Sequence, residues 1–226
     1  MLITLVIIGV VAALTIPNLM QKYTEQATVK KVQKFYSTLS NAYSLARKEN
    51  GTVSEWGLTG ADTQSAEKIY EILFKPYFKI AKDCGGNNTG GCISMKSYIL
   101  LYQTNANRTN GGYSTATNYY KIALNDGASI FWRGSGSSLI YVFYDVNGPK
   151  EPNQWGKDLF EFSVINNGAI PSGMQTGKYA IEPFNSYCAD KSTASGYGCA
   201  AWVIYKGNMD YLHCDLTWDK NSCKDK

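Results

Sequence analysis

The sequence predicts an α+β protein in which a long N-terminal helix packs on an antiparallel β-sheet and disulfides close the C-terminal region. Three observations predict this class: an uncharged run that continues into a seven-residue apolar repeat, several short β-rich segments separated by turn residues, and six cysteines that all follow residue 83. The 226 residues suffice for one sizeable domain with its own core. We expect the long helix over residues 1–51 and a globular head over residues 52–226.

The helix begins with a run of 21 residues, 1–21, that carries no charge. A secretory signal peptide would have basic residues before the run, and a buried core helix would rarely extend this far without a charge. As a helix the run would span about 32 Å, close to the hydrocarbon thickness of a bilayer. We therefore expect it to be a membrane-spanning segment. Pro17 weakens it, because a proline in a helix interior costs about 3 kcal/mol.

Beyond Asn18 the expected helix becomes one-sided. Apolar residues recur every seven positions among Lys, Gln, Ser, Asn and Arg, which indicates one apolar stripe on a water-exposed helix. Asn50-Gly51 provides a C-terminal stop. The stripe would cover one face of the sheet, and its residues are Val29, Val32, Tyr36, Leu39, Tyr43 and Ala46.

The remaining elements follow in order along the chain. Residues 65–82 read as a second helix, broken or kinked near Pro76, and the Gly- and Asn-rich residues 83–92 read as a loop rather than a strand. Strand signals then alternate with turn signals. The expected strands are 96–103, a hairpin over 119–132 that turns at 125–127, 137–146, and a hairpin over 158–173 that turns at 166–168; residues 199–214 are expected as a short helix and turn.

The six cysteines form three close pairs in the sequence. An even number in a chain rich in Gly, Asn and Ser predicts disulfides and an oxidising compartment. The spacings fit no common zinc pattern, and the chain has one histidine. Alternative disulfide pairings among the last four cysteines, such as Cys199 with Cys214, stay open. The favoured pairs are Cys84–Cys92, Cys188–Cys199 and Cys214–Cys223.

The segment LITLVIIGVVAALTIPNL resembles the N-terminal helix of type IV pilins and of the pseudopilins of type II secretion. Members of that family carry a short basic leader ending in Gly, and then Phe-Thr-Leu-x-Glu, before this segment. The resemblance implies five mature residues ahead of Met1, absent through truncation or a misplaced start codon. It assigns the membrane and filament contacts to Leu2, Ile3, Leu5, Val6, Ile7, Ile8, Gly9, Val10, Leu14 and Pro17.

The resemblance implies a structural subunit that resides in the inner membrane and then polymerises through its helix. Its partners would be copies of itself, other pilins and an assembly machinery, in a periplasmic or cell-surface filament. The cysteine-rich region over about 184–226 would be variable and lie on the outer surface. A different class also fits: a single-pass, membrane-anchored binding or adhesion module that stays monomeric. The net charge of +4, without a dense Lys/Arg block, predicts no specific nucleic-acid partner.

The sequence predicts that the protein is not an enzyme. His213 is the only histidine, and it stands beside Cys214. Adjacent side chains of an extended segment point in opposite directions, and Cys214 is expected in a disulfide, so a catalytic Cys–His pair is not expected. The 17 tyrosines and 5 tryptophans would form either a sugar-binding or adhesive surface or the packed core.

One candidate metal site lies between two expected strands, where five oxygen-bearing side chains fall within 14 residues. Such a set suits calcium, and the resemblance implies calcium in this part of the fold, although the spacing is not that of an EF-hand. The alternative is a turn in which Asp and Asn side chains bond to the backbone. The candidate ligands are Asp145, Asn147, Glu151, Asn153 and Asp158.

Overall fold

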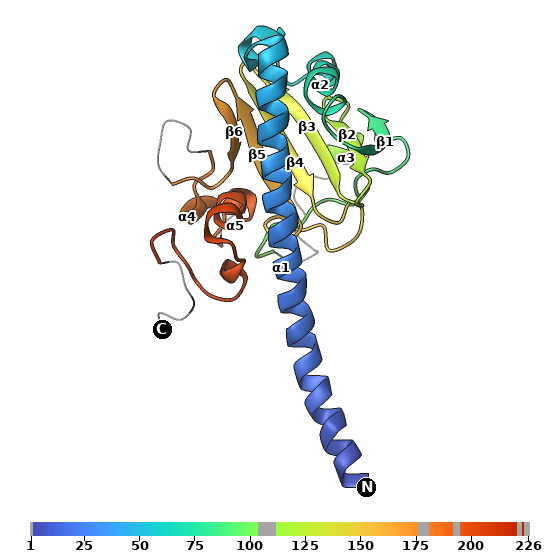
Figure 1. Cartoon of the computed structure of the whole chain (residues 1–226), viewed down its shortest axis with the longest axis vertical. Coiled ribbons are helices and arrows are strands. Elements are labelled where there is room, and N and C mark those ends of the chain that lie inside the picture. The colour runs from blue at the N-terminus through green and yellow to red at the C-terminus, as the bar shows by residue number, and fades with distance from the viewer. Residues whose placement is uncertain (1, 104–111, 176–180, 192–194, 221–222, 224–226) are drawn as a thin grey trace.

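One long helix and one antiparallel sheet make up most of the protein (Figure 1). The structure, a computed structural model, therefore has the α+β class that the sequence predicts. For residues 2–12 it describes the helical backbone but not the side chains. The described residues are 2–103, 112–175, 181–191, 195–220 and 223.

Helix α1 (Leu2–Asn50) is a single helix of 49 residues that crosses the sheet and extends beyond it at its N-terminal end (Figure 1). It ends where the sequence predicts, because Gly51 has a left-handed φ of 79°. A Cβ at this position would lie 2.6 Å from the carboxylate of Glu55. The short helical turn η1 (Val53–Trp56) follows, and the indole N–H of Trp56 donates to the Gly51 carbonyl at 3.0 Å.

The predicted apolar stripe of α1 faces the sheet. Five of its six residues are buried. The sixth, Tyr36, is half-buried and donates its O–H to the carbonyl of Ala169 at 3.3 Å. Phe35, beside the stripe, stacks on Tyr144 with ring centroids 4.1 Å apart. The seven-residue repeat therefore identified the buried face of the helix correctly.

The second helical segment is shorter than predicted. Asp62 starts it by accepting a hydrogen bond from the backbone N–H of Ser65 at 2.7 Å. Helix α2 (Thr63–Ile69) then continues into one turn of π-helix, η2 (Tyr70–Phe74). The chain leaves the helix before Pro76, because proline has no N–H to continue the ladder.

The six strands of the sheet lie in sequence order, and the first one was not predicted. The sequence predicts residues 80–82 as helix and residues 83–85 as loop, and both predictions are wrong, because these residues form β1 (Ile80–Gly85). Strand β1 pairs with β2 (Tyr120–Leu124) through a ladder with two register shifts. Those shifts remove the regular alternation by which a strand is recognised.

The other predicted strands are present with one exception. Both expected hairpins are confirmed. Residues 96–103 do not form a strand: Ile99 makes an isolated bridge to Gln154, and Leu101 donates its N–H to the carbonyl of Ser195 at 3.1 Å. This segment therefore pairs with loops rather than with the sheet. The remaining strands are β3 (Ser129–Ser135), β4 (Leu139–Asp145), β5 (Leu159–Ile165) and β6 (Gly168–Pro171).

The C-terminal region consists of short helices that pack beside α1 (Figure 1). The three favoured disulfides, Cys84–Cys92, Cys188–Cys199 and Cys214–Cys223, are confirmed. The expected helix after Cys199 is also present, and Gln33 of α1 donates to the carbonyl of Ile204 within it at 3.4 Å. The helices are α4 (Phe184–Tyr187), η4 (Tyr197–Cys199), α5 (Ala200–Lys206) and η5 (Asp210–Leu212).

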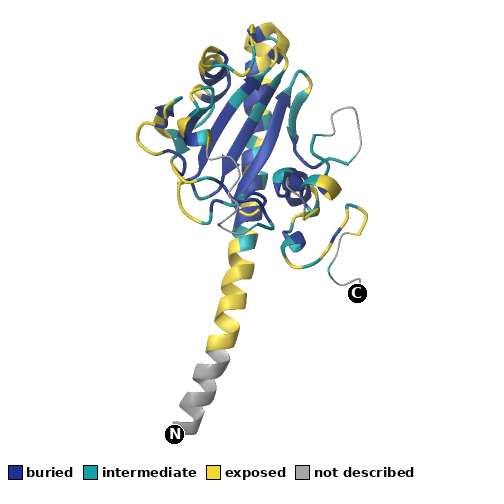
Figure 2. Cartoon of the chain, turned by 180° about the vertical axis from the view of Figure 1, so that it is seen from behind, coloured by how far each residue is buried: buried dark blue, intermediate teal, exposed yellow. Residues whose placement is uncertain are grey.

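The two faces of the sheet are built differently. Helix α1 covers one face, and together they form the larger hydrophobic core. The opposite face, toward the viewer in Figure 2, carries a smaller core around Phe131, Phe143 and Trp155. The short helix α3 (Gly112–Thr115) supplies Tyr113 to this second core.

Candidate functional site

Helix α1 divides into two halves with opposite environments. We call residues 25–50, which lie against the head, the packed half, and residues 2–24, which extend beyond it, the projecting half. Every described side chain of the projecting half, from Ala13 to Thr24, is exposed (Figure 2). Its large apolar side chains are Leu14, exposed to 69%, Ile16 to 56%, Leu19 to 68% and Met20 to 58%.

Two of the residues that the resemblance assigns to the filament, Leu14 and Pro17, lie in this exposed stretch. Pro17 stands inside α1 without ending it, and the amide of Asn18 donates to the Leu14 carbonyl at 3.4 Å. Over the part of the chain that the structure describes, no helix is both long enough and apolar enough to cross a membrane. The assigned side chains that lie outside the described ones are those of Leu2, Ile3, Leu5, Val6, Ile7, Ile8, Gly9 and Val10.

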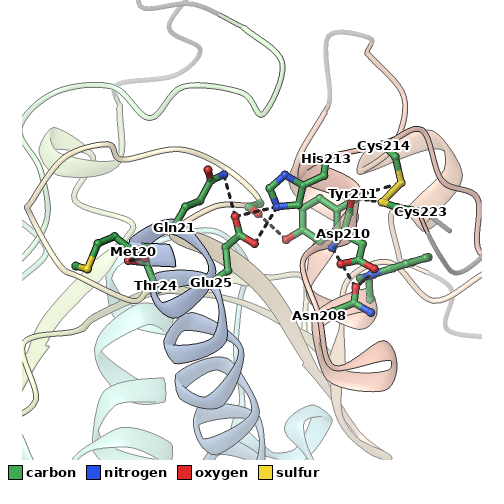
Figure 3. Close-up of polar contacts among 12 residues, drawn as sticks. Met20, Gln21, Thr24, Glu25, Asn208, Asp210, Tyr211, His213, Cys214 and Cys223 are labelled. Carbon is green, nitrogen blue, oxygen red and sulfur yellow. Dashed lines mark hydrogen bonds and ion pairs between the residues drawn. A yellow bond between two sulfur atoms is a disulfide. The ribbon is translucent and has the colours of Figure 1, made fainter. Parts of the chain in front are cut away.

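The two halves meet where α1 leaves the head, and the C-terminal region contacts the helix there (Figure 3). The carboxylate of Glu25 accepts from the amide of Gln21 at 3.1 Å and pairs with Nε2 of His213 at 2.9 Å. The ammonium of Lys31 donates to the carbonyl of Val146 at 3.2 Å. These contacts attach the C-terminal region and the loop after β4 to the first turns of the packed half.

His213 and Cys214 do not form a Cys–His pair. The sulfur of Cys214 is bonded to Cys223, and the ring of His213 faces Glu25 (Figure 3). A disulfide sulfur is not a thiolate, so this position supplies no nucleophile while the bond is intact.

The five predicted calcium ligands lie in the loop of residues 145–158, which we call the acid loop. Asp145 and Asp158 are both buried at its two ends. Glu151 is exposed instead and pairs with Lys96 at 2.9 Å. The structure therefore brings the two aspartates together and leaves Glu151 outside the pair.

All four carboxylate oxygens of the aspartate pair accept hydrogen bonds. Asp145 accepts from the hydroxyl of Tyr98 at 2.7 Å and from the backbone N–H of Asn147 at 3.2 Å. Asp158 accepts from the backbone N–H groups of residues 153–154 at 2.9 and 2.5 Å. This is the hydrogen-bonded turn that the sequence offers as the alternative to a metal site.

The acid loop nevertheless contains groups that suit a cation. Burial raises the pKa of Asp145 well above its usual range, and the charge of Asp158 raises it further; burial raises the pKa of Asp158 to about 6. The side-chain oxygens of Asn147 and Asn153 are buried without a partner among the described residues. Calcium accepts amide and carboxylate oxygens alike, so the four residues fit it. Within the described ranges no cluster of three or more Asp, Glu, His or Cys residues suits a metal, so amide or backbone oxygens must complete the site.

A second group of charged residues, of which Glu161 is buried, was missed by the sequence reasoning. Arg133, Glu161 and Glu182 line a cavity on the sheet face opposite α1. Glu161 had a local signal, because it stands between two phenylalanines in a strand-forming segment, where an acidic residue is unusual. Arg133 and Glu182 lie 28 and 21 residues from it in the sequence and carry no such signal.

Comparison with known proteins finds no curated protein and no solved structure that matches the chain. A model of the family of unknown function DUF6613 matches residues 18–208. This range begins in the projecting half and includes the packed half, the sheet and α5. It covers most of the chain, and the protein therefore belongs to DUF6613, a family of unknown function.

Proposed function

We propose that this protein is a structural filament subunit, of the kind found in type IV pili and type II secretion pseudopili, which polymerises through α1. The observation that carries this proposal is the division of one continuous helix. Its packed half completes the core of the head, whereas the described side chains of its projecting half are all exposed.

The exposed apolar stretch favours burial in an assembly. Between Ala13 and Thr24 the only charged residue is Lys22. Full burial of one Leu, Ile or Met side chain contributes about 1.5–3 kcal/mol relative to exposure. Scattered apolar side chains are ordinary on a protein surface, but a contiguous group of them marks an interaction site. Packing against the same helix of other subunits would bury this group, and a lipid bilayer would do so before assembly.

The head suits a subunit that must keep its shape outside the cytoplasm. Three disulfides each close a short loop: one begins in β1, and the other two lie in the C-terminal region. Aromatic side chains of the packed half, such as Phe35 on Tyr144, fix the helix to the sheet. In this proposal, subunits reside in the inner membrane before assembly. An assembly machinery then joins them with other pilins into a periplasmic or cell-surface filament.

A calcium ion in the acid loop would support the same role. Asp145 and Asp158, with the amide oxygens of Asn147 and Asn153, would hold it. The ion would supply positive charge that offsets the repulsion between the two carboxylates. Because Lys31 donates to the carbonyl of Val146, a stiffer acid loop would also hold the packed half in place.

The alternative function is a membrane-anchored binding module that does not polymerise. The cavity lined by Arg133, Glu161 and Glu182 favours it, because a concave site with aromatic walls and a few polar groups is typical of ligand binding. The two functions differ in one measurable property, which is self-association through the projecting half.

A matched pair of methionine substitutions tests the proposal. Met20 lies in the projecting half and Met95 on the head, and both are exposed, to 58% and 67%. We expect the full chain and its Met95→Asp variant to form filaments when detergent is diluted, and Met20→Asp to remain in small species, since a buried carboxylate is costly. Electron microscopy and the sedimented fraction measure this. Assembly of Met20→Asp at the wild-type level, or a monodisperse wild type without detergent, would contradict the proposal.

A further inference from the structure

The sheet face opposite α1 carries a cavity of about 400 Å³ that neither polymerisation nor the acid loop uses. It lies beside the smaller core and combines aromatic walls with charged groups. Its charged residues are Arg133, Glu161 and Glu182. Its aromatic residues are Tyr113, Tyr119, Tyr141, Phe143, Trp155 and Tyr197.

Strand register places the floor of this cavity on one face of the sheet. Phe143 of β4 pairs with Glu161 of β5, and Arg133 of β3 pairs with Tyr141 of β4. Residues two apart in a strand share a face, so these four side chains are neighbours. The guanidinium of Arg133 lies 5.5 Å from the ring centre of Tyr119 and 5.2 Å from that of Tyr141. These rings hold Arg133 in the wall.

Two carboxyl groups and one guanidinium line the cavity. Glu161 is 4% exposed and accepts a hydrogen bond from the hydroxyl of Ser172 at 3.2 Å. Burial raises its pKa well above the usual range, and the charge of Glu182 raises it further. Burial raises the pKa of Glu182 to about 7. Both shifts favour the protonated carboxyl, so the two groups carry less negative charge than two exposed glutamates would, and Arg133 supplies the opposite charge beside them.

Three buried polar atoms of the lining lack a hydrogen-bond partner within the described part of the chain. They are Nε of Arg133, Nε1 of Trp155 and Oε2 of Glu182. Trp155 is 1% exposed, so bulk water does not cover its indole N–H. Buried donors and acceptors are normally paired, and one left unpaired is destabilising. The cavity therefore favours a ligand that both accepts and donates hydrogen bonds.

We propose that this cavity binds a neutral hydroxylated ligand, namely one ring of a saccharide. A sugar hydroxyl both accepts and donates, so neighbouring hydroxyls would pair with the two N–H donors and the carboxyl oxygen. The flat aromatic side chains provide apolar faces for the C–H side of the ring. An ammonium ligand offers no acceptor for the N–H groups of Arg133 and Trp155, and a phosphate, which mainly accepts hydrogen bonds, would leave Oε2 of Glu182 without a donor.

The saccharide site does not depend on polymerisation. All the residues that carry it lie in the head, so a monomer would bind one ring. In a filament the same site would repeat from subunit to subunit, and a polysaccharide that spans several copies would bind with much higher avidity. Binding is therefore measured on dispersed full-length chain, where a failure to polymerise cannot affect it.

The test uses the full chain in a detergent without a sugar headgroup. Arrayed neutral and acidic glycans are screened first, and cellobiose, maltose, lactose and N,N′-diacetylchitobiose are then titrated by calorimetry. Tetramethylammonium and inorganic phosphate are the charged probes. Glu182→Met removes the acceptor oxygens at similar size, and Arg133→Lys keeps the positive charge but removes the Nε donor. The matched control is Glu71→Gln, because Glu71 is exposed on η2 and pairs with Lys75.

We expect at least one neutral glycan to bind the wild type and the control equally. Glu182→Met and Arg133→Lys should each weaken that binding at least tenfold while their thermal unfolding stays cooperative, which separates lost binding from lost folding. The proposal is overturned if no neutral glycan binds the folded wild type. It is also overturned if both variants bind as the wild type does, or if one of the charged probes binds in place of every sugar.

Discussion

The two halves of α1 differ in what their apolar side chains do. In the packed half Val32, Leu39 and Ala46 have no exposed surface, and they bury against the sheet and the helices around it. In the projecting half Leu14 and Leu19 are exposed to 69% and 68%. The chain is one uninterrupted helix across both, so backbone structure does not separate them. The stability of the head explains the first set of side chains and leaves the second set without a role in the monomer.

The largest expected effect comes from the same substitution made in each half. Leu39→Ala removes a fully buried side chain and should destabilise the head by about 2–5 kcal/mol, because it leaves a cavity. Leu19→Ala, in the exposed stretch, should change the free energy of unfolding by less than about 0.5 kcal/mol. Thermal and urea unfolding of the full chains in one detergent measure both. Equal losses of stability would show that the projecting half also packs within the monomer.

The second prediction concerns the pH dependence of stability that Glu182 causes on the sheet face opposite α1. The folded-state pKa of Glu182 is raised from 4.5 to about 7, so the folded state holds a proton that the unfolded state has lost. Stability from this group is present below about pH 4.5 and is lost as the pH rises to about 7, on the order of 3 kcal/mol in all. We expect Glu182→Gln to flatten this decline and to be more stable than the wild type above pH 7.

Unfolding profiles between pH 4.5 and 8 check this prediction. Glu71→Gln is the control, because Glu71 is exposed and pairs with Lys75 on the protein surface. Parallel profiles for the wild type and Glu182→Gln would mean that burial of Glu182 does not drive the pH dependence.

The third prediction concerns the acid loop, next to the point where the packed half begins. Calcium that binds the folded state alone stabilises it by about 2.7 kcal/mol at a hundredfold excess over Kd. We expect millimolar calcium to raise the melting temperature of the wild type by several degrees relative to chelator, and to leave Asp158→Ala unchanged. Glu151→Ala should keep the full response, because Glu151 pairs with Lys96 away from the aspartates. Identical wild-type melting curves in calcium and in chelator would show that the acid loop is a hydrogen-bonded turn that does not bind calcium.

The smallest expected effect is at the junction of the two halves. The pair between Glu25 and His213 is partly exposed, and such pairs contribute about 0–1 kcal/mol. Glu25→Gln should therefore barely change global unfolding, while hydrogen exchange of η5 and its surroundings becomes faster. Unchanged exchange there would show that the C-terminal region is held by its other contacts with α1.

Sequence patterns predicted the elements whose signals are local. The seven-residue repeat identified the buried face of α1, and Asn125-Asp126-Gly127 identified the turn between β2 and β3. Strand β1 was missed because two register shifts disturb its alternation. Residues 96–103 have the composition of a strand, but they pair with loops, and composition does not contain that information.

The candidate sites were predicted only in part for the same reason. The oxygen-rich composition of the acid loop identified Asp145 and Asp158 as candidate ligands. Spacing alone could not exclude Glu151 from the candidate ligands, although its side chain pairs with Lys96. The cavity of Arg133, Glu161 and Glu182 requires two strands and a distant loop to meet, which no local pattern encodes.

Cysteine cross-linking tests most directly whether subunits polymerise through the projecting half. All six native cysteines are in disulfides, so one introduced cysteine gives a single reactive thiol. Leu19→Cys and Met95→Cys place it at two positions of similar exposure, 68% and 67%, in the projecting half and on the head. After assembly and treatment with a short bismaleimide, we predict a ladder of covalent oligomers for Leu19→Cys and monomer for Met95→Cys. Leu19→Cys that stays monomeric, although its thiol reacts with a maleimide label, would contradict the account.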